Sequence, residues 1–408
     1  MEFLTSIRPA EALALIISFP VGPLRDEEVS LERAAARVLA TDITAQEDIP
    51  PFPRSLVDGY AVRVKDTYGA REGTPAFLQV RGEVLVGEAA EQEVGDGEAL
   101  YVATGAMIPD GADGMVMVEY TRQAGAAIEV TRTVRRGENI CFRGEDVQKG
   151  QVVLEKGRAL SSFDLGVLAA LGITRIPVRQ QPVVGLISSG NEIIPVDGVL
   201  DAGKVRDINT HTVSDLVKKQ GCLVRFAGIA RDTVDDIISR LSALRECDAI
   251  LLSGGSSKGQ SDFMTTAIEG LGGKVLFHGL NIKPGKPTIF AALWGKPVFG
   301  LPGHPVSCAM VVLRFVQPLL ARLKGETRPD LPPTMAGRLT TNIPSAYGIE
   351  EYVRVSVERR EGLMLLVTPI FAKSSVISTL SKADGYVVVP EGQEGIEAGV
   401  EVEVLLLG

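Results

Sequence analysis

The central part of the chain alternates apolar runs with amphipathic stretches, and this alternation restricts the fold more than any other feature of the sequence. Apolar runs of this length predict strands, and the amphipathic stretches between them predict helices. The expected strands are Pro182–Ser188, Cys222–Ile229, Asp248–Leu252, Lys274–Phe277 and Lys296–Gly300, and the expected helices are Asn209–Gln220, Asp232–Glu246 and His304–Leu323. Strands that alternate with helices indicate an α/β domain with a parallel sheet. Ligands of such domains bind at the carboxyl ends of the strands.

The segments before this domain have different patterns. Residues 1–45 are expected to be helical, with helices over Arg8–Ile17 and Leu31–Leu39 that follow Ser or Thr residues. A further helix is expected over Arg158–Ile173. Residues 46–148 are rich in Gly and Pro around short apolar runs, which predicts an all-β segment. Its expected strands include Phe77–Val80, Ala99–Ala103 and Gly114–Glu119.

A second β-region is expected at the end of the chain. Pro329–Pro333 has the composition of a linker. Strand alternation follows it in Tyr352–Val357, Met364–Thr368 and Tyr386–Val389. A chain of 408 residues corresponds to roughly two to four domains, so we expect several separate cores.

The charge and the spacing of residue types exclude some classes of partner. The formal net charge is −9, which makes the chain a poor candidate for binding nucleic acid or an anionic membrane. An anionic substrate therefore needs a locally basic pocket. No stretch reaches the ~18 apolar residues of a membrane span. The four cysteines lack CxxC spacing and the three histidines lack zinc-ligand spacing, which favours reduced thiols in a cytosolic protein over a zinc site.

Two of the expected strands end in small residues that suit an anion. One strand is followed by Ser189-Gly190-Asn191-Glu192, and another by Ser253-Gly254-Gly255 with Asp262 further on. Small residues let backbone amides approach a bound oxyanion, and an acid beside it can hold a cation. Taken singly, each turn is explained as well by tight packing between a strand and a helix.

Two lysines flank a rigid turn in Lys283-Pro284-Gly285-Lys286. Because Pro fixes backbone angles and Gly permits turns, this arrangement suits a phosphate or a tetrahedral oxyanion. The alternative is a solvated loop with incidental lysines. His304, in Gly303-His304-Pro305, precedes a helix, and we expect it to cap or pack there.

The β-segment has two candidates of its own. Asp58 stands at an Asp-Gly turn, for which a plain hairpin is the simpler interpretation. Thr104 stands before Gly105 in what reads equally as a loop between two strands.

Taken in order, these motifs resemble the MoeA/gephyrin family of molybdenum insertases over essentially the whole chain. The motifs that carry the resemblance are Ser55-Leu56-Val57-Asp58-Gly59-Tyr60-Ala61, Thr104-Gly105-Ala106, Ser189-Gly190-Asn191-Glu192, Ser253-Gly254-Gly255, Lys283-Pro284-Gly285-Lys286-Pro287 and Gly300-Leu301-Pro302-Gly303. No single motif decides the resemblance, but the ordered set is specific.

The resemblance implies a multidomain α/β plus β fold. Its parts are an elongated N-terminal domain from 1–45 and 149–177, an inserted β-domain at 46–148, a molybdopterin-binding α/β domain with a parallel sheet at 178–328, and a C-terminal β-barrel-like domain at 329–408. It also implies an elongated homodimer. In such a dimer the active cleft lies between the α/β domain of one subunit and the inserted β-domain of the other.

The resemblance also implies roles for individual residues. Catalytic roles fall on Asp58, Thr104, Glu192, Asp232, Asp262 and Lys283, and binding roles on Gly190, Ser253, Gly254, Gly255, Lys286, Arg354 and Ser374. Arg354 and Ser374 match oxyanion-binding positions. Asp58, Asp232 and Asp262 are expected to hold Mg²⁺, which takes few carboxylates and keeps waters. The alternative for Asp232 is a helix N-cap.

Three positions depart from the family pattern. Gly279 stands where some relatives place a lysine four residues before Lys283, Lys258 stands where Val is frequent, and Ile349 stands where an Arg often follows a Gly. The positive charge that a lysine would bring to position 279 is then missing or supplied by another residue, for which Lys258 is the candidate.

The implied function is molybdenum insertion into adenylylated molybdopterin, with molybdate and Mg²⁺ and with release of AMP, in the cytoplasm. Two alternatives stay open: adenylylation of molybdopterin, which is the preceding step, and a pterin- or oxyanion-binding scaffold without turnover. Expected partners are a second copy of the chain, the adenylyltransferase of the preceding step and molybdoenzyme carriers. The sequence does not choose between molybdate and tungstate.

Overall fold

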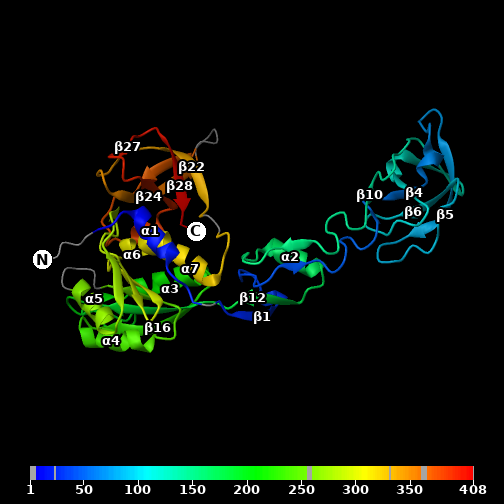
Figure 1. The fold of residues 1–408 in the computed structure, drawn as a ribbon. Coiled ribbons are helices and arrows are strands. Elements are labelled where there is room, and N and C mark those ends of the chain that lie inside the picture. Colours follow the sequence, from blue (N-terminus) through cyan, green and yellow to red (C-terminus); the bar gives the residue numbers. More distant parts are fainter. Residues whose placement is uncertain (1–5, 23, 255–259, 330–331, 360–364, 408) are drawn as a thin grey trace.

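The computed structural model describes residues 6–407 apart from 23, 255–259, 330–331 and 360–364. Figure 1 shows an elongated molecule. The α/β region (green and yellow) and the C-terminal β-region (orange and red) lie together at one end. The inserted β-segment (cyan) lies at the other end, and the strands and helix that join them form a narrow middle.

The α/β region is built on a six-stranded sheet in the order β16-β13-β17-β21-β20-β18. Its strands are β13 (Val183–Ser189), β16 (Leu223–Ala230), β17 (Ala249–Ser253), β18 (Lys274–His278), β20 (Ile289–Leu293) and β21 (Lys296–Leu301). The first four in this order are parallel, as expected. The expectation of a wholly parallel sheet is wrong at one edge, where β20 and β18 run antiparallel to their neighbours.

A tight hairpin causes this exception. β20 and β21 are joined by Trp294 and Gly295 alone, and both have positive φ, 54° and 75°. Two-residue loops with positive φ at both positions match the twist of antiparallel strands. Because β20 was not expected from the sequence, the antiparallel pairing of β18 and β21 with it was not expected either.

The helices of the α/β region cover this sheet. They are α3 (Asn209–Lys219), α4 (Val234–Ala243), α5 (Gln260–Gly270), α6 (Pro305–Val311) and α7 (Gln317–Lys324), with a π-helical turn at Val312–Val316 between the last two. Pro305–Lys324 is long and apolar enough to cross a membrane, contrary to the sequence-based expectation that no stretch reaches this length. However, 72% of its apolar window is buried within the fold, which makes it a core helix.

The first residues of the chain pack on the same core. α1 (Pro9–Ser18) buries Ala12 and Ile16 beside α7. The expected helix over Leu31–Leu39 is wrong. Only a 3₁₀ turn forms at Leu31–Arg33, after strand β1 (Asp26–Ser30). Ala36 adopts a positive φ of 59°, which breaks a helix.

The narrow middle of the molecule has its own small core. β1 pairs antiparallel with β12 (Arg175–Arg179), and α2 (Ser162–Ala170) packs beside them. α2 is shorter than the predicted helix because it begins at a capping box, in which Ser161 and Asp164 each accept a hydrogen bond from the other's backbone N–H.

The inserted segment forms a six-stranded sheet in the order β7-β4-β6-β5-β9-β8. Its strands are β4 (Gly59–Val62), β5 (Ala76–Val84), β6 (Glu98–Val102), β7 (Gly114–Met117), β8 (Thr121–Ala124) and β9 (Ala127–Val130). The chain enters and leaves this sheet through two short antiparallel pairs. They are β2 (Ile43–Thr44) with β11 (Val152–Leu154) and β3 (Arg54–Ser55) with β10 (Ile140–Cys141).

The C-terminal strands close into a barrel, because β24 pairs with both β25 and β26 while β22 and β28 complete the circle. The strands are β22 (Thr334–Leu339), β24 (Glu350–Arg359), β25 (Leu365–Pro369), β26 (Gly385–Val389) and β28 (Glu401–Leu406). A short strand of the α/β region, β19 (Ile282–Lys283), adds to β24 in parallel. The barrel is thereby joined to the segment that carries the paired lysines.

Candidate functional site

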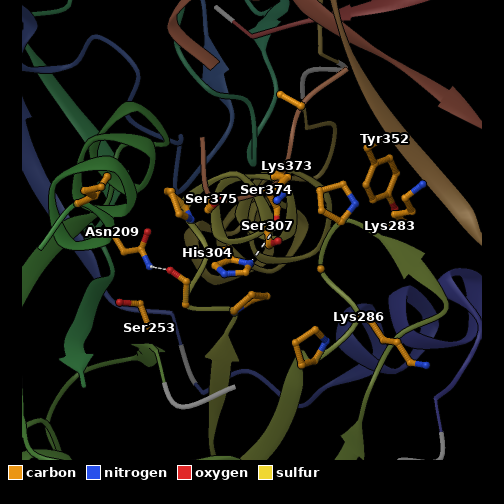
Figure 2. A pocket seen from close by; sticks show the side chains of 18 of the residues that line it. Asn209, Ser253, Lys283, Lys286, His304, Ser307, Tyr352, Lys373, Ser374 and Ser375 are labelled. Carbon is orange, nitrogen blue, oxygen red and sulfur yellow. Dashed lines mark hydrogen bonds between the residues drawn. The ribbon is translucent and has the colours of Figure 1, made fainter. Parts of the chain in front are cut away.

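A cavity of about 1020 Å³ lies where the carboxyl ends of the central strands meet the barrel. The ends of β13, β17 and β21 form one wall, the turn after β19 forms another, and the barrel loop 370–375 closes the opposite side. Figure 2 shows Ser253, Lys283, Lys286, His304 and Ser374 gathered around this cavity. It is thus built at the place where α/β domains bind ligands.

The turn after β17 leaves no room for a side chain. Gly254 has a φ of 99°, and a Cβ there would lie 2.0 Å from the carbonyl oxygen of Ser189. The ends of β13 and β17 therefore approach each other at backbone distance, and Ser253 and Gly254 both line the cavity. Gly190, with a φ of 152°, makes the matching turn after β13. Gly255, the other expected member, lies outside the described residues.

The paired lysines also line the cavity. Lys283 Nζ lies 2.8 Å from Glu351 Oε1, and that carboxylate also accepts a hydrogen bond of 2.9 Å from Ser345. The Lys283 side chain is 64% exposed while the Glu351 side chain is only 12% exposed. The pairing of β19 with β24 brings the two together. Lys286, on the far side of the Pro-Gly turn, is exposed to the same cavity.

Arg354 is buried in the barrel wall and lines the cavity. Two of its nitrogens donate to the Thr379 hydroxyl and, at 2.7 Å, to the Ala372 carbonyl, so the guanidinium holds the loop that carries Ser374. Its Nε is buried without a hydrogen-bond partner among the described residues. Burial lowers the pKa of the Arg354 guanidinium from its ordinary value.

His304 is the N-cap residue of α6, as the sequence allowed, but its side chain makes no capping hydrogen bond. Its Nδ1 lies 2.9 Å from the Ser374 hydroxyl instead. The backbone of the same serine accepts a hydrogen bond of 3.1 Å from the N–H of Val306. The barrel loop is thus held against the first turn of α6 at two points, and Figure 2 shows the imidazole facing Ser374.

The expected acids of the α/β region lie at the same edge of the sheet, at different depths. Glu192 is exposed and lines the cavity. Asp232 does not line the cavity, but it accepts a hydrogen bond of 3.2 Å from the hydroxyl of Ser189, which does. It also accepts one of 3.1 Å from the Asn191 N–H. It is not the N-cap of α4, because Thr233 holds that position. Asp262 is exposed in the first turn of α5 and does not line the cavity.

The two candidates of the inserted segment are close to each other. Asp58 precedes β4, and its Oδ1 accepts a hydrogen bond of 2.8 Å from the Thr104 N–H after β6. The hairpin interpretation of Asp58-Gly59 is wrong, because β3 pairs with β10 and not with β4. Neither residue lines the cavity, and Figure 1 shows their sheet at the end of the molecule away from the α/β region.

Comparison with known proteins decides the family. The MoeA N-terminal region (domain I and II) matches residues 7–172, a probable molybdopterin binding domain matches 185–322, and the MoeA C-terminal region (domain IV) matches 336–407. The chain belongs to the MoeA family. The resemblance seen in the sequence and the multidomain α/β plus β fold class are thereby confirmed, with the antiparallel sheet edge as the correction.

Known proteins resemble this chain along nearly its full length. A putative molybdopterin biosynthesis protein from Methanocaldococcus jannaschii is 35% identical and is covered over 100% of both chains. The molybdopterin molybdenumtransferase of Bacillus subtilis is 35% identical over 93% of this chain and 90% of its own. The crystal structure of a molybdopterin biosynthesis MoeA protein from Pyrococcus horikoshii OT3 superposes with a TM-score of 0.85, at 36% identity, over 98% of this chain and 100% of that one.

In this MoeA-family chain the three acids expected to hold Mg²⁺ do not meet. Among the residues that the structure describes, no three His, Cys, Asp or Glu side chains lie close enough to hold a metal ion. Asp232 and Asp262 lie at the α/β edge, whereas Asp58 lies in the inserted sheet. Oxygen donors of the kind that Mg²⁺ prefers are present, but one chain does not bring them to one point.

The cavity also contains residues that the sequence did not single out. Asp207 is 5% exposed and accepts hydrogen bonds from the backbone and hydroxyl of Thr210, and Asn209 donates at 2.9 Å to the Gly303 carbonyl. Lys373, beside Ser374, adds a cation, and Glu351 pairs with Lys283. Asp207 could have been found from the sequence, because it is an acid just before the predicted helix Asn209–Gln220. No local sequence pattern distinguishes Lys373 or Glu351.

The N-terminal segment closes the space around Gly279, the position at which the family pattern led us to expect a lysine in some relatives. Gly279 has a φ of 111°, and a Cβ there would lie 3.0 Å from the hydroxyl of Ser6. Ile7 donates a hydrogen bond of 3.1 Å to the Gly279 carbonyl. A side chain at this position would be strained and crowded, which explains why glycine stands here. Lys258, the suggested replacement, lies outside the described residues.

Proposed function

We propose that this chain inserts molybdenum into adenylylated molybdopterin and releases AMP, as a molybdopterin molybdenumtransferase. The observation that carries the proposal is the cavity at the junction of sheet and barrel. One wall offers Lys283 and Lys286, and the opposite wall offers Lys373 and Ser374. Two anionic reactants have to meet in this reaction, so a cavity with cations on two sides meets its main electrostatic requirement.

The two walls of the cavity have different roles in this reaction. The Gly-rich turns at Ser189-Gly190 and Ser253-Gly254 take the pterin and its phosphate, since their backbones have no side chains in the way. Lys283 and Lys286 neutralise phosphate oxygens. Cleavage adds water across the pyrophosphate bond, so that AMP leaves with one phosphate and the pterin retains the other. The two dithiolene thiols then bind molybdenum, and their protons leave with one molybdate oxygen as water.

Molybdate is held on the barrel side in this proposal. Ser374 offers a hydroxyl and Lys373 an ammonium group at the cavity surface. Arg354 lines the same cavity, and its guanidinium also fixes the Ala372 carbonyl of this loop. The planar fork of an arginine can hold a loop in one geometry while its positive charge still favours an anion beside it.

We further propose that Asp232 and Asp262 hold Mg²⁺ together with Asp58 from a second subunit. Bound there, the ion would neutralise phosphate charge. This requires a homodimer in which the inserted β-domain (46–148) of one subunit faces the α/β domain (178–328) of the other. The elongated domain (1–45 and 149–177) and the C-terminal domain (329–408) complete the subunit. We assign this enzyme to the cytoplasm.

The proposal is tested with purified protein, adenylylated molybdopterin, Mg²⁺ and molybdate. We expect AMP to appear only when protein and oxyanion are both present, together with a product that activates an apo-molybdoenzyme. Tungstate, run in parallel, reports the oxyanion preference. Accumulation of the adenylylated pterin from ATP and molybdopterin, without AMP release on adding molybdate, would instead assign the preceding adenylylation step.

A further inference from the structure

A histidine that the proposed function does not use is in direct contact with an oxyanion-binding position. His304 Nδ1 and Ser374 Oγ are 2.9 Å apart, and the two residues come from different parts of the fold. The imidazole belongs to the start of α6, and the hydroxyl belongs to the barrel loop. Because the ring makes no capping bond, its hydrogen bond to Ser374 is what orients it.

The direction of this hydrogen bond decides what Ser374 can offer an anion. A serine hydroxyl has one proton to donate and two lone pairs to accept with. If the hydroxyl donated to the imidazole, only lone pairs would face the cavity, and these repel an oxyanion. If the imidazole donates, the single proton of the hydroxyl is free to point at the anion.

We propose that His304 donates from Nδ1 to the Ser374 hydroxyl and thereby turns the proton of that hydroxyl toward the oxyanion in the cavity. His304 is then a positioning residue for molybdate and not a proton carrier. This inference rests on the proposed function. It adds one residue, His304, and the direction of the hydrogen bond that this residue makes to Ser374. Either the neutral Nδ1–H tautomer or the imidazolium can donate in this way.

The neighbouring charges are consistent with an anion at this point. Lys373 is adjacent in the loop, and Lys283 and Lys286 line the same cavity. The acids that share the cavity are Glu192, Asp207 and Glu351. Asp207 already accepts two hydrogen bonds from Thr210, and Glu351 is paired with Lys283, so both are occupied as acceptors.

Substitutions at position 304 can keep, reverse or remove the hydrogen bond to Ser374. The Nδ1 of histidine and the Nδ2 of asparagine are both bonded to Cγ, so His304→Asn keeps a donor at the same reach from the backbone. His304→Asp puts an oxygen there that can only accept, which reverses the hydrogen bond and forces Ser374 to donate to it. His304→Leu removes the contact, and Ser374→Ala removes the hydroxyl.

The experiment measures the dissociation constant of molybdate alone by calorimetry for the full-length protein and these variants, and then KM for molybdate and kcat from AMP release. We expect His304→Asn to stay within about threefold of the wild type, and His304→Leu and Ser374→Ala to bind about tenfold more weakly, or about 1.4 kcal/mol. His304→Asp should bind more weakly still. Adding His304→Leu to Ser374→Ala should cost nothing further.

Several outcomes would overturn the inference. Asparagine and aspartate variants of equal affinity would mean that the direction of the hydrogen bond is irrelevant. A full additional loss in the double variant would mean that His304 does not act through Ser374. A changed pH profile of kcat in His304→Asn would assign proton transfer to the imidazole. A wild type that binds molybdate but releases no AMP ends the proposed function, while the ranking of molybdate affinities still decides this inference.

Discussion

The cavity beside the barrel and the inserted β-sheet carry different groups of the expected site. The cavity carries the lysines, and the inserted sheet carries an acid. The cavity brings Lys283, Lys286 and Lys373 around one space. The inserted sheet holds Asp58 against the Thr104 N–H at the other end of the molecule. A single chain therefore gathers the cations of the site by itself, and our proposal is that the remaining acid comes from another copy.

The difference follows from how each region is attached. The barrel is joined to the α/β region by the β19–β24 pairing and by the contacts of Ser374 with His304 and Val306. Among the described residues, the inserted sheet is joined to the narrow middle by the short pairs β2–β11 and β3–β10. Tyr352 and Tyr386 of the barrel also belong to the hydrophobic core of the α/β region. A shared core fixes the geometry of a site within a chain, whereas a slender connection leaves a surface available to a second subunit.

The largest effect is expected from Asp58→Asn, the change that removes the acid of the distant region. Asparagine keeps an oxygen that accepts the Thr104 N–H, so the fold should survive while AMP release falls by at least about 100-fold. AMP release and thermal unfolding are both measured. Glu83→Gln, at a position on β5 of the same sheet, serves as the control and should retain full activity. Wild-type turnover in Asp58→Asn would remove the distant region from the site.

The next effect is expected in the cavity itself. Lys283→Gln removes a cation and leaves the Glu351 carboxylate facing the cavity without its partner. We expect kcat/KM for the adenylylated pterin to fall about tenfold to 100-fold, because a negative charge is then uncompensated near an anion. Adding Glu351→Gln should restore part of this loss. If the double variant is as impaired as Lys283→Gln, the carboxylate does not oppose the substrate.

A smaller effect, on stability alone, is expected in the narrow middle. Burial by itself would raise the pKa of the Asp164 carboxyl, but the Ser161 backbone N–H, the Arg158 guanidinium and the Ser161 hydroxyl together outweigh it and lower that pKa. A lowered carboxyl pKa adds stability above the unfolded-state value, and this stability is lost as the pH falls through the folded-state value.

Asp164→Ala should therefore cost about 1 kcal/mol at neutral pH, because the capping box is removed. The difference from the wild type should shrink as the pH approaches the acid range, as followed by urea unfolding. Specific activity should not change, because α2 does not touch the cavity. A stability difference that is constant with pH would mean that the charge of Asp164 does not contribute.

The smallest effect concerns how fast the cysteine thiols of the α/β region and of the inserted segment react with an alkylating agent. Cys222, Cys247 and Cys308 of the α/β region are buried, and burial raises the pKa of Cys222 to about 12. Because the thiolate is the reactive form, these thiols should resist alkylation near pH 8. Cys141, in the attachment of the inserted sheet, is partly exposed and should be the first to react. Mass spectrometry of alkylated protein checks this order, and rapid labelling of Cys308 would contradict it.

The sequence predicted the elements that repeat a strong local pattern. The strands that became β13, β16, β17 and β21 lie within about one residue of their predicted bounds, because continuous apolar runs identify buried strands. β20 was missed, and with it the antiparallel edge, because its Trp294-Gly295 turn is not a frequent hairpin signal. The helix predicted at Leu31–Leu39 failed because tertiary contacts replaced it: Ala36 and Leu39 donate to the backbone of Leu160 and Arg158.

The candidate site was predictable to the extent that it lies in motifs. Ser253, Gly254, Lys283 and Ser374 line one cavity although they are far apart in sequence. Their convergence depends on strand order and on the β19–β24 pairing, which no local pattern encodes. The roles of Glu351 and His304 as partners were missed for the same reason, since each acts through a residue from a different part of the chain.

The most direct test of a site shared between subunits is a mixed dimer of Asp58→Asn and Lys283→Gln chains, carrying different affinity tags and purified as the heterodimer. If the acid comes from the second subunit, one of the two sites is intact, and AMP release should recover to about half of the wild-type rate. Each homodimeric variant should stay at or below about a tenth of the wild-type rate. A heterodimer as inactive as the two homodimers would contradict the account, because Asp58 and Lys283 would then have to act within one chain.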